Sequence, residues 1–503
     1  MNSVPQLLAR FQERGITLFL FDGALKFKAP PGAMAQSDRD ELTRAKPDIV
    51  NYFLAQKAAA FPPLEAAARP HAPAHIQVAW WAWVRHSPVQ LPHERLGFVI
   101  EVPHASPAHI QTVLRDVITR HGTLSTRFFE REGQLALDYN SPSAFFIESE
   151  TSPAASTDEA WARAREFTGR KLAVESEWLL RAKAISLPSG ETLLALVVHH
   201  ILADGYTIEL LHAELEAILL DQPAALPVET DIHFTDYAAL ERKWFETAGP
   251  ALIAYWKNWL AQQAPLKLGT RVLQWENAGR NTNNDFLLGA PAVRRMEELG
   301  QQLNTSAFIV YLTVFAISLA RWSGQKQFPV RCIGNLRGTH APFAVIGNLV
   351  CADPVSVDIP ESFEFPALVR SVAREYYNAI TLRLPSLLNF PAHPAYPELA
   401  QEKFTNTIAA TMNFAPGKAY ASTGTAPRQS GEGVETMEWP PKVERTPPQD
   451  WPALLWPINF RLSEMGGQIA GLFQFNEDII APGQQDRLMA IFFDELAAVM
   501  RRP

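Results

Sequence analysis

Apolar and polar positions follow several different periods along the chain, and each change of period predicts an element. Apolar residues at helical spacing over 3–15 predict a short helix that closes on a glycine. Two β-like runs follow at 16–21 and 24–29, and the Asp-Gly dipeptide between them favours a hairpin. Helical spacing returns over 37–56. Together these patterns predict a small α-β-hairpin-α unit at the N-terminus.

A change in composition marks the end of this unit. Ser37 is the expected N-cap of its second helix, and Pro47 interrupts the helical pattern. Residues 57–74 are rich in Ala and Pro and carry little periodicity, which is typical of a semi-extended linker. We therefore expect this linker to separate the core of the N-terminal unit from the core of the remaining chain.

Helical and strand-like patterns alternate from residue 75 onward. The apolar run 192–198 predicts a strand that is buried on both faces. The run 307–320 predicts a buried core helix, because it is too short to span a bilayer. Residues 416–456 are rich in Pro, Gly, Ser and Thr and predict a long surface loop. The alternation predicts a mixed α/β fold.

Composition and charge exclude several classes of function. Hydrophobic residues make up 47% of the chain and charged residues 19%, which indicates a globular protein. The net charge is −8 and no basic run occurs, so we expect no nucleic-acid partner. Cys332 and Cys351 form no CxxC pair, so we expect no zinc site and a reducing, cytoplasmic compartment. The N-terminus shows no signal-peptide pattern, and we expect no membrane association.

The sharpest chemical signal is the segment VVHHILADG, which contains His199, His200, Asp204 and Gly205. It lies where a buried strand is expected to end and a helix to begin, a position where side chains reach a crevice in α/β folds. A neutral imidazole there can accept a proton from an attacking amine or hydroxyl near pH 7. Asp204 can cap the helix or form a buried ion pair, and Gly205 permits close approach of a substrate chain.

The same residues permit two less specific interpretations. Two packed histidines and an ordinary helix cap would explain an isolated His-His pair, but the complete HHxxxDG string between strand and helix favours function. A metal site is disfavoured, because His200 and Asp204 have plausible ligand spacing while no third ligand is evident and HExxH is absent. We therefore expect no metal.

The HHxxxDG string resembles the active-site motif of nonribosomal peptide synthetase condensation domains, which share a fold with chloramphenicol acetyltransferase. Further segments resemble the family's motifs in order along the chain: IQVAWW (76–81), RHGTLSTRF (120–128), FTDYA (234–238), AYWKNWL (254–260) and IGNLVCADPV (346–355). Ser125, Cys351 and Ala352 depart from the family pattern, which weakens the assignment of a standard aminoacyl acceptor.

This resemblance implies a role for each residue of the motif. His199 and His200 form the catalytic pair, in which His200 is the general base or positions the nucleophile and His199 is structural. Asp204 is a structural aspartate that pairs with Arg337, and Gly205 borders the acceptor channel. The implied fold is α/β, with two chloramphenicol-acetyltransferase-like subdomains that meet in a V.

Residues 1–56 resemble a second family, the β-hairpin docking domains at the N-termini of some synthetase subunits. The segment ERGITLFLFDGALKFKAPPGAM (13–34) matches their GIxLxxxGxxLxxxAPxG pattern. The resemblance implies that the C-terminal tail of an upstream subunit docks on the hairpin, whose exposed edge can accept it as an added strand. The expected docking residues are Ile16, Leu18, Leu20, Lys26 and Lys28.

The two faces of the hairpin are expected to serve different purposes. Lys26 and Lys28 alternate onto one face, where they can meet an acidic tail. The alternative is that Phe19, Phe21 and Phe27 only form a small core under the helices. Both can hold, because each strand has two faces.

The two resemblances divide the chain into four parts: a docking domain (1–56), a linker (57–74), an N-terminal condensation subdomain (75–248) and a C-terminal condensation subdomain (249–503). They imply transfer of an acyl chain from the phosphopantetheine thioester of a carrier protein to a hydroxyl or amine, which forms an ester or amide. The expected partner is an acyl carrier or peptidyl carrier protein of another subunit, and no cofactor is expected to bind directly.

We expect release of the chain from a nonribosomal peptide or polyketide assembly line onto a small-molecule acceptor, because no adenylation or carrier motif is visible. One alternative is an elongating condensation domain with a carrier-bound aminoacyl acceptor. Another is a CoA-dependent acyltransferase, which the docking unit disfavours because CoA needs no docking. A non-catalytic scaffold is disfavoured by the intact HHxxxDG string.

Overall fold

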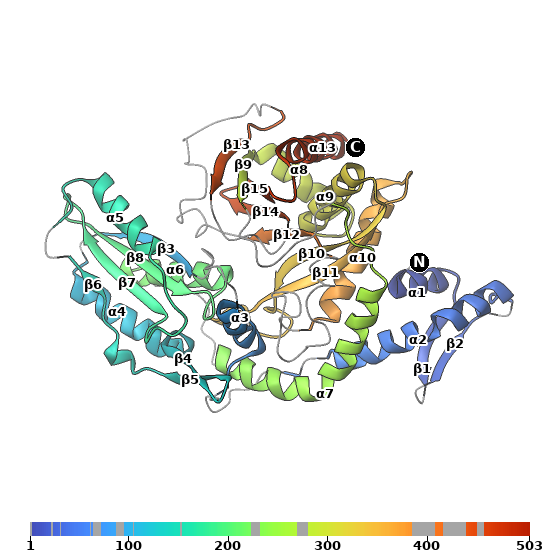
Figure 1. Ribbon diagram of the computed structural model, residues 1–503, viewed down its shortest axis with the longest axis horizontal. Helices are drawn as coiled ribbons and strands as arrows, with labels where there is room; N and C mark the ends of the chain where they lie inside the picture. Colours follow the sequence, from blue (N-terminus) through green and yellow to red (C-terminus); the bar gives the residue numbers. More distant parts are fainter. Residues whose placement is uncertain are drawn as a thin grey trace.

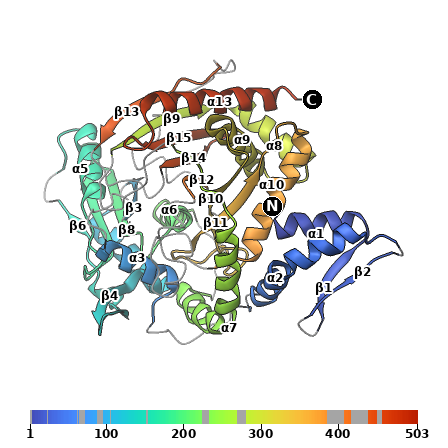
Figure 2. The ribbon, with the colours of Figure 1, turned by 45° about the vertical axis from the view of Figure 1, so that its right-hand side comes forward.

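A computed structural model shows two α/β lobes that open as a V, with a smaller helix-and-hairpin unit attached to one side (Figure 1). A view turned by 45° shows the same arrangement (Figure 2). The structure describes residues 3–21, 24–30, 32–60, 62–63, 72–86, 95–103, 105–150, 153–222, 232–268, 280–384, 408–415, 439–449 and 457–502.

The N-terminal unit has the predicted order of helix, hairpin and helix. Its elements are α1 (Val4–Glu13), β1 (Thr17–Phe21), β2 (Ala24–Lys28) and α2 (Gln36–Ala58). The two strands pair antiparallel over their whole length, while the Asp22-Gly23 turn between them lies outside the described residues. The unit has a small core formed by Leu7, Phe11, Ile16, Leu18, Leu42 and Ile49.

The start of α2 differs from the prediction. Ser37 is not the N-cap, because α2 begins after Ala35, whose backbone N–H donates to the Asp38 carboxylate at 2.8 Å. The same carboxylate accepts two hydrogen bonds from Arg14, so Asp38 fixes the helix start to the end of α1. The helix continues through Pro47.

The N-terminal lobe is built on a four-stranded sheet of order β3-β8-β7-β6. Its elements are α3 (His75–His86), β3 (Arg95–Val102), α4 (Pro107–Arg120), η2 (Gly122–Ser125), β4 (Thr126–Arg131), β5 (Gln134–Tyr139), η3 (Pro142–Ala144), β6 (Glu148–Ser149), α5 (Thr157–Gly169), β7 (Leu180–Ser186), β8 (Thr192–His199) and α6 (Gly205–Leu219). Every residue of β8 is buried, as its uninterrupted apolar sequence predicts.

The C-terminal lobe contains a seven-stranded sheet of order β11-β10-β12-β14-β15-β9-β13. Its elements are α7 (Phe234–Ala261), β9 (Asn281–Leu288), α8 (Ala290–Gln302), α9 (Ala307–Ser323), β10 (Gln327–Asn335), β11 (Val350–Asp358), α10 (Phe365–Thr381), β12 (Ala410–Ala415), β13 (Glu444–Gln449), β14 (Ile458–Met465), β15 (Gln468–Asn476) and α13 (Pro482–Met500). Within the described ranges no single helix is long and apolar enough to cross a membrane, although α8 and α9 pass that test as a pair bent by 101°.

The region that was expected to be a long loop contains a strand. β13 pairs with β9 at the edge of the large sheet, whereas 416–438 and 450–456 lie outside the described residues. Pro447 and Pro448 argue against a strand in the sequence. They fall where the register of β13 against β9 shifts, between Thr446 and Gln449, so neither has to donate an N–H to the ladder of this edge strand.

Two connections lock the lobes together. Helix α7 runs along the base of the V (Figure 1), with Phe234 and Tyr237 in the core of the N-terminal lobe and Trp256 in the core of the C-terminal lobe. The segment 336–349 between β10 and β11 packs into the N-terminal core in return. The expected subdomain boundary at 248/249 therefore falls inside one continuous helix.

The N-terminal unit also packs against the C-terminal lobe. Tyr52 and Ala55 of α2 belong to the core of the C-terminal lobe, where Tyr52 packs against Tyr255 with ring centroids 6.0 Å apart. The carboxylate of Asp48 accepts a hydrogen bond from the Asn258 side chain of α7 at 3.0 Å. The N-terminal unit thus keeps its own small core, while the end of α2 also packs into the core of the C-terminal lobe.

Candidate active site

The histidine pair lies at the end of the central strand of the N-terminal lobe. His199 is the last residue of β8, and its neighbour His200 begins the turn that leads to α6. Asp204 is the N-cap of that helix, and its Oδ1 accepts a hydrogen bond from the Thr207 N–H at 2.8 Å. Gly205 is the first residue of the helix. The local sequence thus produces the strand-turn-helix context that it predicts.

A buried ion pair joins this turn to the C-terminal lobe. Arg337 Nη1 donates to Asp204 Oδ2 at 2.7 Å, and both side chains are almost fully buried. Arg337 Nη2 also donates to Thr207 Oγ1 and to the Gly347 carbonyl, while Asp204 Oδ2 accepts from the Leu349 N–H at 2.8 Å. The predicted pair is therefore present, and it clamps the 336–349 segment onto α6.

The charge of Asp204 is held by this network. Burial alone would raise the pKa of Asp204, but the charge of Arg337, its hydrogen bond and two backbone N–H groups outweigh burial and lower it. Three donors and full burial hold this carboxylate in its ionised form, in contact with Arg337. Asp204 is thus suited to a structural role rather than to proton transfer.

His199 is inaccessible and neutral. Its side chain is fully buried, and its Nδ1 accepts a hydrogen bond from the Ile201 N–H at 3.0 Å. Burial, with a smaller contribution from His200, lowers the pKa of His199 to about 3. The geometry makes His199 a support for the turn and leaves no access for a substrate.

His200 is the accessible member of the pair. Its residue is only partly buried, in contrast to His199. Burial of the ring lowers the pKa of His200, and the Asp204 charge opposes that effect without cancelling it. The imidazole is therefore neutral near pH 7 and can accept a proton.

Two neighbours of His200 were not identified from the sequence. Asn348 Nδ2 donates to the His200 carbonyl at 2.6 Å and lies 3.5 Å from His200 Nδ1. The indole of Trp80 stacks on the imidazole, with ring centroids 4.8 Å apart and planes 30° apart. Asn348 lies inside a segment that was matched to a family motif, and Trp80 adjoins the matched Trp81, so only tertiary contacts could reveal them.

A second buried ion pair supports the strands that flank the clamp. Arg383 forms a bidentate pair with Asp353 of β11, with both nitrogen-to-oxygen distances 2.7 Å, and donates to the Asn335 carbonyl at the end of β10. A Cβ at Gly334 would lie 2.9 Å from Arg383 Nη2, so this position favours glycine. The pair thereby fixes the start of the segment that carries Arg337.

The five predicted docking residues do not share one surface. Ile16 and Leu18 are buried in the small core of the N-terminal unit, so they are not available to a partner, and Leu20 is partly buried. Lys26 and Lys28 are exposed. The pairings Phe19↔Lys26 and Thr17↔Lys28 place both lysines on the outer face of the hairpin together with Phe19, which is 40% exposed.

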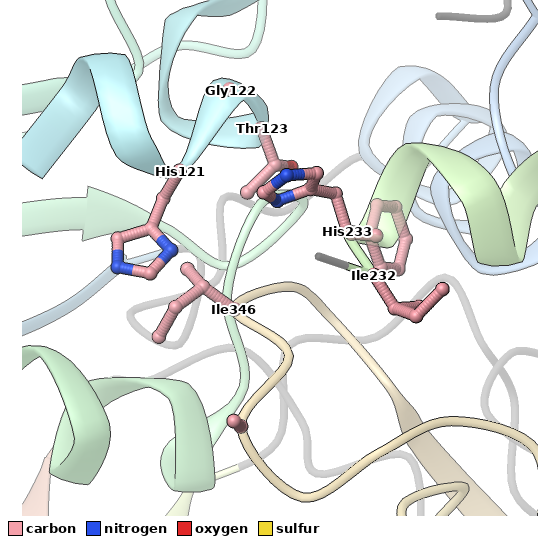
Figure 3. A pocket seen from close by; sticks show the side chains of 8 residues that line it. His121, Gly122, Thr123, Ile232, His233 and Ile346 are labelled. Atoms are coloured by element: carbon pink, nitrogen blue, oxygen red, sulfur yellow. The ribbon is translucent and has the colours of Figure 1, made fainter. Parts of the chain in front are cut away.

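A small hollow with a volume of about 10 Å³ lies near the junction of the lobes, between the end of α4 and the start of α7 (Figure 3). It is lined by His121, Thr123, His233 and Ile346, among others, and by no residue of the HHxxxDG string. It is smaller than typical ligand pockets. Within the described parts of the chain, no group of three or more His, Cys, Asp or Glu residues could hold a metal ion.

Two α/β lobes joined by a buried arginine–aspartate clamp, with a His-His-turn-Asp-Gly segment at their junction, define a condensation-type protein. The condensation domain model matches residues 100–381, and the chain belongs to the condensation-domain family. Residues 4–56 match the TubC N-terminal docking domain.

Solved structures extend the likeness to the whole chain. A structure described as the molecular basis for condensation domain-mediated chain release from the enacyloxin polyketide synthase is 32% identical and superimposes with a TM-score of 0.84. The match covers 99% of this chain and 97% of that one. The EpoB cyclization-docking bidomain from Sorangium cellulosum has the same fold at 15% identity, with a TM-score of 0.65 and coverage of 100% and 99%.

Curated relatives are much larger proteins. A component of the linear gramicidin synthase from Brevibacillus parabrevis is 27% identical over 54% of this chain. Chondramide synthase cmdD from Chondromyces crocatus is 27% identical over 57% of this chain. The chain covers only 5% and 8% of these two relatives.

Proposed function

We propose that this protein transfers an acyl chain from the pantetheine thioester of a carrier protein to a hydroxyl or amine, and that the transfer releases the chain from its assembly line. The observation that carries the proposal is the accessible, neutral imidazole of His200 on a turn clamped between the lobes. The chain-release function named for the enacyloxin structure supports it. The pantetheine arm belongs to the donor substrate, and we propose no further cofactor.

The reaction needs one base and one acid, and His200 serves as both in turn. As the acceptor oxygen or nitrogen attacks the thioester carbonyl carbon, its proton passes to the imidazole of His200. The tetrahedral intermediate then collapses, the carbon–sulfur bond breaks, and the imidazolium returns the proton to the leaving thiolate. The products are the ester or amide and the free pantetheine thiol.

A hydroxyl acceptor gains more from this base than an amine does, because the hydroxyl is the weaker nucleophile until it loses its proton. The altered motif residues do not decide the acceptor. Ser125, Cys351 and Ala352 are all buried, and Ser125 Oγ donates to the Gly122 carbonyl at 2.7 Å. These are packing positions, so our preference for ester formation rests on the chemistry of His200 alone.

The test is product formation from an acylated carrier protein with free small alcohols and amines, followed by intact-mass spectrometry of the carrier. We expect released ester or amide without a second carrier protein, and no product from a His200→Ala control. Product only from a carrier-bound aminoacyl acceptor would replace chain release by chain elongation. Equal turnover of acyl-CoA would make the protein a CoA-dependent acyltransferase.

We further propose that the outer face of the hairpin binds the acidic, extended C-terminal tail of an upstream subunit. Phe19 on β1 provides exposed apolar surface, and the exposed Lys26 and Lys28 on β2 provide positive charge on the same face. An extended tail can also add to a free strand edge through backbone hydrogen bonds. The carrier protein that delivers the acyl chain would then arrive with this tail.

The Lys26→Glu/Lys28→Glu variant is expected to weaken binding of an acidic tail peptide, and to weaken it more at low than at high salt, because salt screens exposed charges. Fluorescence anisotropy at two salt concentrations measures the effect. The control is Lys243→Glu/Lys257→Glu, which makes the same charge change on exposed positions of α7. Equal loss of affinity in both variants would reduce the effect to net charge and reject the hairpin as the binding surface.

A further inference from the structure

Helix α3 lies across the histidine turn and is held there by buried polar contacts. The His75 N–H at its start donates to Glu241 Oε2 of α7 at 2.8 Å. The side chain of Gln77 accepts from the Ala74 N–H at 3.0 Å and reaches the Ile201 carbonyl at 3.5 Å. The His75 contact ties the start of α3 to α7, and the Gln77 contact with Ile201 ties it to the turn after β8.

Trp80 lies about one helical turn beyond Gln77 and packs against both histidines. Trp80 is 5% exposed, and its ring lies edge-on to His199, with centroids 6.4 Å apart and planes 77° apart. Against His200 it lies nearly parallel, with centroids 4.8 Å apart. A residue three positions along a helix lies on the same face, so the contacts of Gln77 also aim the indole at His200.

The stacked geometry matters most when His200 is charged. The face of an indole is negative, and tryptophan is the side chain that attracts a cation over its ring most strongly. The attraction grows where water is excluded, and on the indole side of the pair it is, because Trp80 is only 5% exposed. A neutral imidazole gains less from the same contact, so Trp80 favours the imidazolium over the neutral ring.

Other groups around His200 also act on the charge of its imidazole. Asp204 is the carboxylate that acts on His200, but its charge is already paired with Arg337. His199 is buried and neutral, and Asn348 contributes an amide rather than a charge. Backbone hydrogen bonds at His200 and Ala203 also favour the charged ring, and the indole adds a further source of stabilisation for a charge that forms during the reaction.

We propose that Trp80 is a positioning residue, whose indole face holds the imidazole of His200 in place and stabilises the imidazolium formed when the acceptor loses its proton. This inference rests on the proposed acyl transfer for its catalytic consequence. The contact with His200 exists without it and can be measured without substrate. An interaction that is stronger in the charged state raises the rate of the chemical step.

The test compares Trp80→Leu and Trp80→Phe with the wild type over a range of pH. Leucine keeps the site apolar but removes the negative ring face, so the pKa of His200 is expected to fall. Because the base must be neutral to act, the acid limb of the rate profile should move to lower pH, by about one unit. The maximal rate of Trp80→Leu should fall by about 10-fold. Trp80→Phe should keep part of the wild-type rate and part of the wild-type position of the acid limb.

A matched control uses the neighbouring tryptophan. Trp81 is also buried on α3, but Arg85 lies over its ring, 5.2 Å from the centroid. Trp81→Leu therefore removes a buried indole from the same helix without touching the pair of rings. The Trp81→Leu variant should show the acid limb of the rate profile at the wild-type pH, even if its melting temperature falls.

A second readout needs no substrate. NMR of protein with ¹³C-labelled histidine, assigned through His200→Gln, reports both the titration of His200 and the upfield shift that a stacked indole causes. Loss of that shift and a lower titration midpoint in Trp80→Leu support the proposal, even if no acyl donor is turned over. An unchanged midpoint, or a rate loss that is equal at every pH, would overturn it and leave Trp80 a packing residue.

Discussion

The His200→Ala variant is expected to lose about 10²–10⁴ in the rate of acyl transfer, the usual effect of removing a general base, and more if the ring also positions the acceptor. The protein should stay folded, because His200 is partly exposed and its imidazole takes no part in the Asp204–Arg337 network. Single-turnover kinetics with an acylated carrier, together with thermal unfolding, measure both quantities.

His200→Gln is the matched variant, since glutamine keeps a polar side chain of similar reach but cannot accept the proton as a base. Both variants should lose rate without losing more than a few degrees in melting temperature. Wild-type turnover in either one would show that the base lies elsewhere and would reject the mechanism. A collapse of the melting temperature would instead give His200 a structural role.

The Asp204→Ala variant is expected to lower the free energy of unfolding by about 3–5 kcal/mol, because it leaves the guanidinium of Arg337 buried without its partner. Activity should fall as well, since the 336–349 segment loses its anchor on α6 and carries Asn348. Denaturant unfolding monitored by circular dichroism measures the stability.

The exposed pair Lys326–Glu361 provides the control, because Glu361→Ala removes an ion pair of similar length from the surface. That change should leave the unfolding curve almost unmoved, as exposed pairs contribute little. An Asp204→Ala curve that coincides with the Glu361→Ala curve would contradict the clamp.

The Asp204–Arg337 pair also sets the direction in which the stability of the protein depends on pH. The pKa of Asp204 is lowered in the folded protein, so its contribution to stability is complete above the unfolded value of about 4. The contribution is lost as the pH falls through the lower folded value. Wild-type protein should therefore lose more stability than Asp204→Ala between neutral and acidic pH.

Sequence patterns predicted the local elements well, because these depend on neighbours along the chain. The uninterrupted apolar run of β8, the hairpin pairing and the cap at Asp204 all follow from short-range rules. The pairing with Arg337 spans 133 residues and came only through the family resemblance. The sequence alone does not give the distance between Asp204 and Arg337 or the burial of their side chains.

Three of the features that the sequence did not reveal have one physical origin. Tyr52 and Ala55 lie on the second helix of what looks like a small independent unit, and only the tertiary structure shows that α7 covers them. Ile16 and Leu18 have the alternation of a binding edge but face inward. Trp80 sits beside a matched motif residue and carries no signal of its own. Each case concerns which face of an element meets which partner, and a single sequence does not state that.

The shared core of α2 and α7 has a consequence for attempts to redirect this protein to a new upstream subunit. An exchange of the whole N-terminal unit would replace Tyr52 and the Asp48–Asn258 contact, and with them part of the hydrophobic interior of the enzyme. The outer face of the hairpin is free of that constraint. On the docking surface proposed above, a change of partner would need substitutions on β1 and β2 only, while α2 would stay with the C-terminal lobe that it packs against.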